Sequence, residues 1–103
     1  MKVREMRTAE DVLAERLQDP EFRREWERTA IARAVAMKVV TYRAEHGLSQ
    51  SALGRMLDMP QPAIARLESG EHEPTFATLA KLSRVLGIVF HIDISAEAIQ
   101  LTA

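Results

Sequence analysis

The chain has no cysteine, which excludes a disulfide scaffold and a thiolate metal site. It also has no apolar run that approaches the length of a membrane span, and its amino terminus lacks the pattern of a secretory signal peptide. Charge of one sign is not in excess, because 14 basic side chains face 15 acidic ones and the formal net charge is −1. We therefore expect a cytoplasmic protein with no membrane contact.

Features that typify an enzyme are absent as well. The 103 residues suffice for one compact domain with at most an appended arm. There is no glycine-rich phosphate loop, and His46, His72 and His91 do not form a nucleophile or metal-ligand pattern. The sequence therefore predicts a protein that is not an enzyme, with no catalytic residues, no metal and no cofactor.

Two short amphipathic segments lie between residues 48 and 70, separated by a tight break. The first, over residues 50–57, follows Ser49, whose hydroxyl can cap a helix. The second, over residues 61–67, begins between two prolines, which suit a helix cap and first turn. Each has apolar residues at helical spacing but is too short to be stable alone. Two such helices joined by a short turn predict a helix-turn-helix.

This stretch resembles the Xre/Cro family of helix-turn-helix proteins, which includes the lambdoid phage repressors. The similarity covers roughly residues 38–88. The matching residues are Gly47, Leu48, Ser49, Gln50, Leu53, Leu57, Ile64, Leu67, Glu68, Gly70, Pro74, Leu86 and Gly87. The resemblance implies an all-α fold, a five-helix lambda-repressor-like domain, here with an N-terminal helical arm and one C-terminal β-strand. It also implies a nucleoid-associated repressor whose partner is double-stranded operator DNA.

The resemblance makes residues 61–67 the recognition helix. Glutamine at its first position can pair with adenine through two hydrogen bonds, whereas arginine can bind a guanine edge or a phosphate. The predicted base-reading residues are Gln61, Pro62, Ala65 and Arg66. The predicted phosphate-binding residues are Ser49, Gln50 and Arg55, although a solvated surface role is the simpler interpretation for Arg55.

Two charged residues match family positions that form an ion pair between the first helix and the end of the recognition helix. These are Arg43 and Glu68. A partly buried pair of this kind holds orientation more than it adds stability.

The N-terminal region predicts further helices. A short capped helix is expected over residues 8–17, and Asp19 and Pro20 are typical of the start of another. Because no glycine or proline follows before Gly47, we expect this second helix to continue to about Glu45.

The N-terminal region has a resemblance of its own. The run Asp19-Pro20-Glu21-Phe22, followed by Trp26, is similar to the leader of HigA-type antitoxins. That resemblance implies a type II toxin–antitoxin pair and a RelE/HigB-like ribonuclease toxin as partner. The alternative is that the apolar stripe that includes Phe22 and Trp26 packs within its own chain. The predicted toxin-binding residues are Leu13, Leu17, Phe22 and Trp26.

Near the C-terminus, Thr75 is expected to cap a helix whose core face includes Phe76 and Val85. The apolar period then changes to the alternation of a half-buried strand. No second convincing strand is found, and residues 95–103 are read as a short helix or a frayed end. Because a single strand needs a partner, we expect a homodimer formed by antiparallel strand pairing, or pairing with a toxin's sheet edge. The predicted dimer-strand residues are Val89, Phe90, His91, Ile92, Asp93 and Ile94.

These predictions divide the chain into an N-terminal helical arm (1–36), a helix-turn-helix domain (37–88) and a dimerisation strand with its tail (89–103). The leading hypothesis is a dimeric repressor that is also an antitoxin and autoregulates its operon. The alternative is a free-standing phage-like or metabolic repressor without a toxin. A third hypothesis is an interaction module that no longer binds DNA, because Glu71 and Glu73 should repel phosphate.

Overall fold

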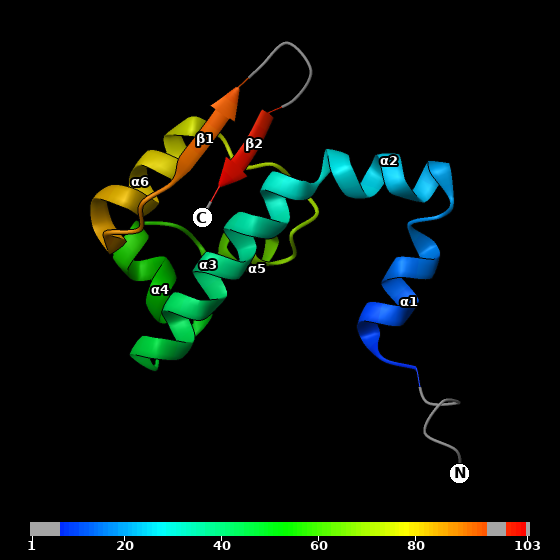
Figure 1. The fold of residues 1–103 in the computed structure, drawn as a ribbon. Helices are drawn as coiled ribbons and strands as arrows, with labels where there is room; N and C mark the ends of the chain where they lie inside the picture. Colours follow the sequence, from blue (N-terminus) through cyan, green and yellow to red (C-terminus); the bar gives the residue numbers. More distant parts are fainter. Residues whose placement is uncertain (1–6, 95–98, 103) are drawn as a thin grey trace.

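The computed structural model describes residues 7–94 and 99–102, and these form six helices and a two-stranded sheet (Figure 1). The helices are α1 (Ala9–Arg16), α2 (Pro20–Arg28), α3 (Ala30–His46), α4 (Gln50–Leu57), α5 (Gln61–Glu68) and α6 (Phe76–Leu86). The strands are β1 (His91–Ile94) and β2 (Ile99–Thr102). The predicted all-α class is confirmed. No helix among the described residues is long and apolar enough to cross a membrane.

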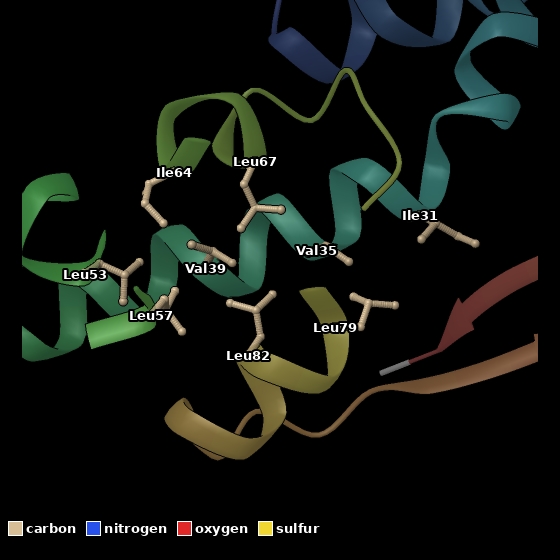
Figure 2. Close-up of a cluster of buried hydrophobic side chains, with 9 residues drawn as sticks. All are labelled: Ile31, Val35, Val39, Leu53, Leu57, Ile64, Leu67, Leu79 and Leu82. Carbon is tan, nitrogen blue, oxygen red and sulfur yellow. The ribbon is translucent and has the colours of Figure 1, made fainter. Parts of the chain in front are cut away.

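The core lies between α3 and the three helices that follow it. Figure 2 shows side chains from α3, α4, α5 and α6 pointing toward one another in one cluster. The largest fully buried side chains are Val35, Val39, Leu53, Leu57, Ile64 and Leu82. Burial of each such side chain contributes roughly 1.5–3 kcal/mol relative to exposure. We refer to α3–α6 as the helical body. It includes α3 from its first residue, so α3 runs through the boundary that we placed after residue 36.

Hydroxyl and carboxylate caps begin four of the helices. The Ser49 hydroxyl accepts a hydrogen bond from the Ala52 N–H at 3.0 Å, and the Thr75 hydroxyl accepts one from the Thr78 N–H at 3.1 Å. Thr8 and Asp19 cap α1 and α2 in the same way. These bonds satisfy N–H groups that have no partner inside a helix.

The expected long helix from Pro20 to about Glu45 is wrong, because the chain turns at Thr29. Its φ and ψ are −98° and 12°, and α2 ends before it while α3 begins after it. The Thr29 hydroxyl donates to the Glu25 carbonyl at 3.0 Å and accepts a hydrogen bond from Arg33 Nη1 at 2.5 Å. Such side-chain bonds compete with the regular helix pattern. We refer to α1 and α2 as the leader helices, and Figure 1 shows α2 extending away from the start of α3 with α1 lying apart from the body.

The expected single strand is also corrected, because β1 has a partner in its own chain. The strands pair antiparallel, with His91 opposite Thr102 and Ile94 opposite Ile99. Figure 1 shows β2 lying between β1 and α3. The four residues of β2 are too few for an alternating pattern to identify a strand from the sequence. The hairpin is therefore defined by the pairing of the two strands in the fold. A second copy is therefore not required to pair β1. The rest of the C-terminal prediction, at residues 95–98 and 103, lies outside the described residues.

The predicted core face of α6 includes residues that the structure leaves exposed. Leu79 and Leu82 are buried, but Phe76 is 70% exposed and Val85 is also exposed. Only one side of α6 meets the body, so these two apolar side chains face outward.

Candidate nucleic-acid interface

The helix-turn-helix is built by α4, α5 and the turn between them. Asp58 takes a left-handed conformation with φ of 53°, which aspartate tolerates better than most residues. The Met59 N–H then donates to the Gly54 carbonyl at 2.8 Å, and Pro60 occupies the N-cap position of α5. The chain thus turns sharply within three residues, and α5 lies against α3 and α4.

Gly54 has a role that the sequence interpretation missed. It is buried inside α4, and a Cβ atom added there would lie 2.5 Å from the Met59 carbonyl oxygen. Glycine therefore allows the turn to approach α4 closely. The available signal was the glycine itself, because glycine within a helix costs about 1 kcal/mol relative to alanine and usually has a packing reason.

Arg43 and Glu68 form a two-fold hydrogen-bonded ion pair between α3 and the end of α5. The distances are 2.5 Å from Nε to Oε2 and 2.7 Å from Nη2 to Oε1. The Glu68 side chain is 7% exposed and that of Arg43 is 22% exposed. Hydrogen bonds from Arg43 lower the pKa of Glu68, while burial acts in the opposite direction. Arg43 Nη1 also donates to the Leu48 carbonyl at 3.0 Å, which ties the loop before α4 to the pair.

Two glutamines continue this network to the start of α5. Gln50 Nε2 donates to Glu68 Oε1 at 3.1 Å, and Gln61 Nε2 donates to Gln50 Oε1 at 2.7 Å. The exposed amide of Gln61 is therefore linked through Gln50 and Glu68 to the guanidinium of Arg43. These bonds use one N–H of Gln61 and leave its carbonyl oxygen and second N–H available to a ligand.

The structure brings three of the seven predicted DNA-contact residues together. Ser49 caps α4, Gln50 is its first residue and Gln61 begins α5, so these three gather where both helices start. Pro62 and Arg55 are exposed, and Ala65 is half-buried. Arg66 is exposed but does not join this group, because it lines a cleft of about 870 Å³ on the side of the leader helices.

That cleft separates α2 from the loop between α5 and α6. Trp26 and Arg33 contribute to its wall on the α2–α3 side, whereas Glu71, His72 and Glu73 contribute from the loop. All three loop side chains are exposed. Among the described residues, no group of three or more His, Asp or Glu side chains is arranged to hold a metal ion.

Guanidinium groups cover the aromatic stripe of the leader helices. Phe22 and Trp26 stack with 6.1 Å between ring centroids. The Arg16 guanidinium carbon lies 4.3 Å from the Phe22 centroid, and that of Arg33 lies 3.4 Å from the Trp26 centroid. Burial lowers the pKa of Arg33. The other predicted toxin contacts, Leu13 and Leu17, are half-buried.

The predicted dimer strand does not present one uniform face. Val89 is exposed, as are His91 and Asp93, whereas Phe90 and Ile92 are half-buried and pack against the core of the body. The backbone of Ile94 pairs with β2.

Comparison with known proteins agrees with this geometry. Residues 40–89 match a helix-turn-helix family. An uncharacterized HTH-type transcriptional regulator of Haemophilus influenzae is 39% identical over 54 residues, which cover 52% of this chain and 55% of that protein. The chain thus spans about half the length of this curated relative. No solved structure shows a significant match. Residues 40–89 form a helix-turn-helix domain.

Proposed function

From this helix-turn-helix domain, we propose that the chain is a sequence-specific DNA-binding transcriptional repressor. The observation that carries the proposal is the hydrogen-bonded path from the Gln61 amide through Gln50 and Glu68 to Arg43. A base edge is read best by a side chain whose orientation is set before binding. Gln61 is exposed and held at the start of α5, so its free amide atoms can pair with adenine in the major groove.

The start of α4 supplies the proposed phosphate contact. Ser49 and Gln50 lie beside the first N–H groups of α4, and helix N-termini favour anions. Contacts of this kind set the register on DNA, and Gln61 then supplies sequence preference. A chain bound in this way over its own promoter represses by steric exclusion of other proteins.

The small number of basic side chains after Gly47 favours a homodimer. After Gly47, the basic residues Arg55, Arg66, Lys81 and Arg84 are outnumbered by acidic ones. Nonspecific affinity grows with the number of phosphates neutralised, so one copy should bind DNA weakly. Two copies that read half-sites about one DNA turn apart would restore affinity.

The test is binding of the full chain to DNA from upstream of its own coding region, measured across salt concentrations. Gln61→Ala should weaken binding to the preferred site about tenfold, because loss of a bidentate base contact costs roughly 1–3 kcal/mol. It should change binding to unrelated DNA little. Gln18→Ala, at an exposed glutamine in the leader, is the matched control. Equal affinity for all DNA sequences, or no salt-dependent binding, would contradict the proposal.

Arg66→Ala tests whether Arg66, which lines the cleft beside the leader helices, contacts DNA at all, and it distinguishes the two contacts predicted for this side chain. Loss of a phosphate contact should weaken binding to all sequences and reduce the salt slope by about one. Loss of a guanine contact should instead relax sequence preference at one base pair.

The finer part of the proposal is that the chain is a type II antitoxin. The leader helices would bind a RelE/HigB-like ribonuclease, and the complex would autoregulate the operon. The support is a leader that has no buried residues and carries an exposed Val12 on α1 and the Phe22–Trp26 stripe on α2. Copurification with the product of the neighbouring reading frame tests it. Trp26→Ala should release that product, whereas Phe76→Ala, at an exposed aromatic of the body, should not.

A second candidate is a free-standing repressor without a toxin. It is favoured by the guanidinium groups over both rings, because Arg16 and Arg33 already cover faces that a partner would otherwise bury. If the chain binds its promoter but the product of the neighbouring reading frame does not copurify with it, this second candidate is favoured. In both cases we propose that the chain acts by binding alone, without catalysis, metal or cofactor.

A further inference from the structure

A shallow groove of about 260 Å³ runs along the second half of α3. It is lined by Met37, Lys38, Thr41, Tyr42, Glu45 and Ile88. None of these residues belongs to the group of DNA-contact residues at the starts of α4 and α5. The groove therefore has no assigned role in the proposed function.

Apolar side chains around the groove are left in solvent. Met37 is 68% exposed and Val89, next to Ile88 in the chain, is 62% exposed. Val40, on the following turn of α3, is also exposed. Scattered apolar residues are normal on a protein surface, but Met37 and Ile88 line the same groove, and apolar side chains gathered at a groove are typical of an interaction surface.

The two ends of the groove have opposite charges. Lys38 and Glu45 are seven residues apart, so they lie on one face of α3 with about 10 Å of helix between them. Within residues 7–94 and 99–102, neither side chain forms an ion pair with another part of the chain. Thr41 and Tyr42 occupy the middle of the stripe.

This charge arrangement is complementary to itself under a two-fold rotation. If a second α3 lies antiparallel on the first, each Lys38 faces the partner's Glu45, and the short Thr41 side chain lets the helices approach near the axis. The same rotation places the apolar groove walls against each other. A second copy of this chain necessarily presents the complementary arrangement of charge and apolar surface, whereas an unrelated partner does not.

We propose that a second copy of this chain occupies the groove, through an isologous contact centred on Thr41 of α3. This contact would give the proposed repressor its pair of reading helices, and in that respect it rests on the proposed function. It differs from the strand pairing expected from the sequence, in which a second copy was needed as the partner that β2 supplies to β1.

Charge reversal tests the contact through the mass of the full chain in solution, measured by sedimentation across concentration at low salt. In a dimer of Lys38→Glu, the new acidic side chain of each copy faces Glu45 of the other copy, which makes two repulsive pairs. In a dimer of Glu45→Lys, the new basic side chain of each copy faces Lys38 of the other copy. Each single variant should raise the dimer dissociation constant about tenfold or more, because two attractive pairs become repulsive. Arg23→Glu and Glu27→Lys, at an exposed ion pair of α2, are the matched controls and should leave it unchanged.

A mixture of the two single variants gives the decisive result. In the mixed dimer, the two acidic side chains of one copy face the two basic ones of the other, so the dimer should return and contain one copy of each variant. The double variant should also dimerise with itself. Circular dichroism checks that all variants are folded.

A chain that is monomeric throughout, or a dimer that neither single variant weakens, would overturn the inference. Failure of the mixture to recover the dimer would overturn it as well. These outcomes are separable from the proposed function. Promoter binding by a dimer that is insensitive to charge reversal leaves the repressor proposal standing without this contact, whereas a charge-sensitive dimer that binds no DNA supports the contact and contradicts the repressor.

Discussion

Different interactions stabilise the helical body and the leader helices. All eleven buried hydrophobic residues among those described belong to α3–α6, whereas α1 and α2 have none. The leader relies on helix caps, exposed ion pairs and two guanidinium–ring contacts. Exposed ion pairs contribute little to stability, and helices of eight or nine residues are marginal alone. The body should therefore unfold as one unit, while the leader opens at much lower free energy.

The sharpest way to test this contrast is to truncate one leucine in each region. Leu53→Ala, at a fully buried side chain of α4, should lower the free energy of unfolding by about 3 kcal/mol, because it removes transfer energy and leaves a cavity. Leu17→Ala, at a half-buried position of the leader, should change it by less than about 1 kcal/mol. Urea unfolding of both variants provides the measurement. Equal losses would mean that the leader belongs to the cooperative unit.

The second prediction concerns backbone packing within the body. Gly54→Ala should destabilise the protein by about 2 kcal/mol, because the added methyl group forces the Met59 carbonyl away from α4. It should also weaken DNA binding by shifting α5. Ser51→Ala, at an exposed position of the same helix, should have an effect within about 0.5 kcal/mol. Thermal unfolding of both variants decides the point, and a stabilised Gly54→Ala variant would contradict the close approach.

The third prediction uses pH to separate the body from the leader. Hydrogen bonds from Arg43 lower the pKa of Glu68 from its ordinary value near 4.5, so the unfolded state binds more protons in the range between the lowered pKa and about pH 4.5. This part of the stability is fully present above about pH 4.5 and is lost as pH falls through the lowered pKa. Glu68→Gln should remove about 1 kcal/mol at neutral pH, since a neutral hydrogen bond is weaker than a charged one.

The difference between the wild-type chain and Glu68→Gln should therefore shrink in acid. Asp11 and Glu25 of the leader also have lowered pKa values, through the Thr8 cap and Arg28 respectively. Both groups titrate in the wild-type chain and in Glu68→Gln, so their contributions to stability cancel in the difference between the two proteins. Unfolding in urea at pH 7 and pH 3 measures the effect, and a difference that grows in acid would contradict the assigned role of Glu68.

The same contrast explains what the sequence could predict. Local sequence patterns predict the helices of the body. Ser49 and Thr75 cap helices through their own hydroxyls, and the spacing of Leu53 and Leu57 identifies the buried face of α4. The start of α5 at Gln61, after Pro60, also followed from the local pattern. These features depend on residues within one or two turns of each other.

The errors arose where distant or side-chain interactions decide. Thr29 interrupts the long helix through bonds to Glu25 and Arg33, although its intrinsic helix propensity is only slightly unfavourable. The β1–β2 hairpin depends on pairing that four alternating residues do not reveal. The position of Arg66 beside the leader depends on the direction of α2, which the break at Thr29 sets.

The smallest expected effect on global stability comes from the junction of the two regions. Trp26→Ala removes the ring beneath the Arg33 guanidinium, a contact worth roughly 0.5–1 kcal/mol where it is exposed. Global unfolding should change by less than about 0.5 kcal/mol, because the body does not depend on this ring. Hydrogen exchange should nevertheless become faster at the α2 amides, while Val39 and Leu82 of the core keep their protection. If Trp26→Ala instead lowered core protection by as much as Leu53→Ala, the leader would be a structural part of the body, and its proposed availability to a partner would lose its physical basis.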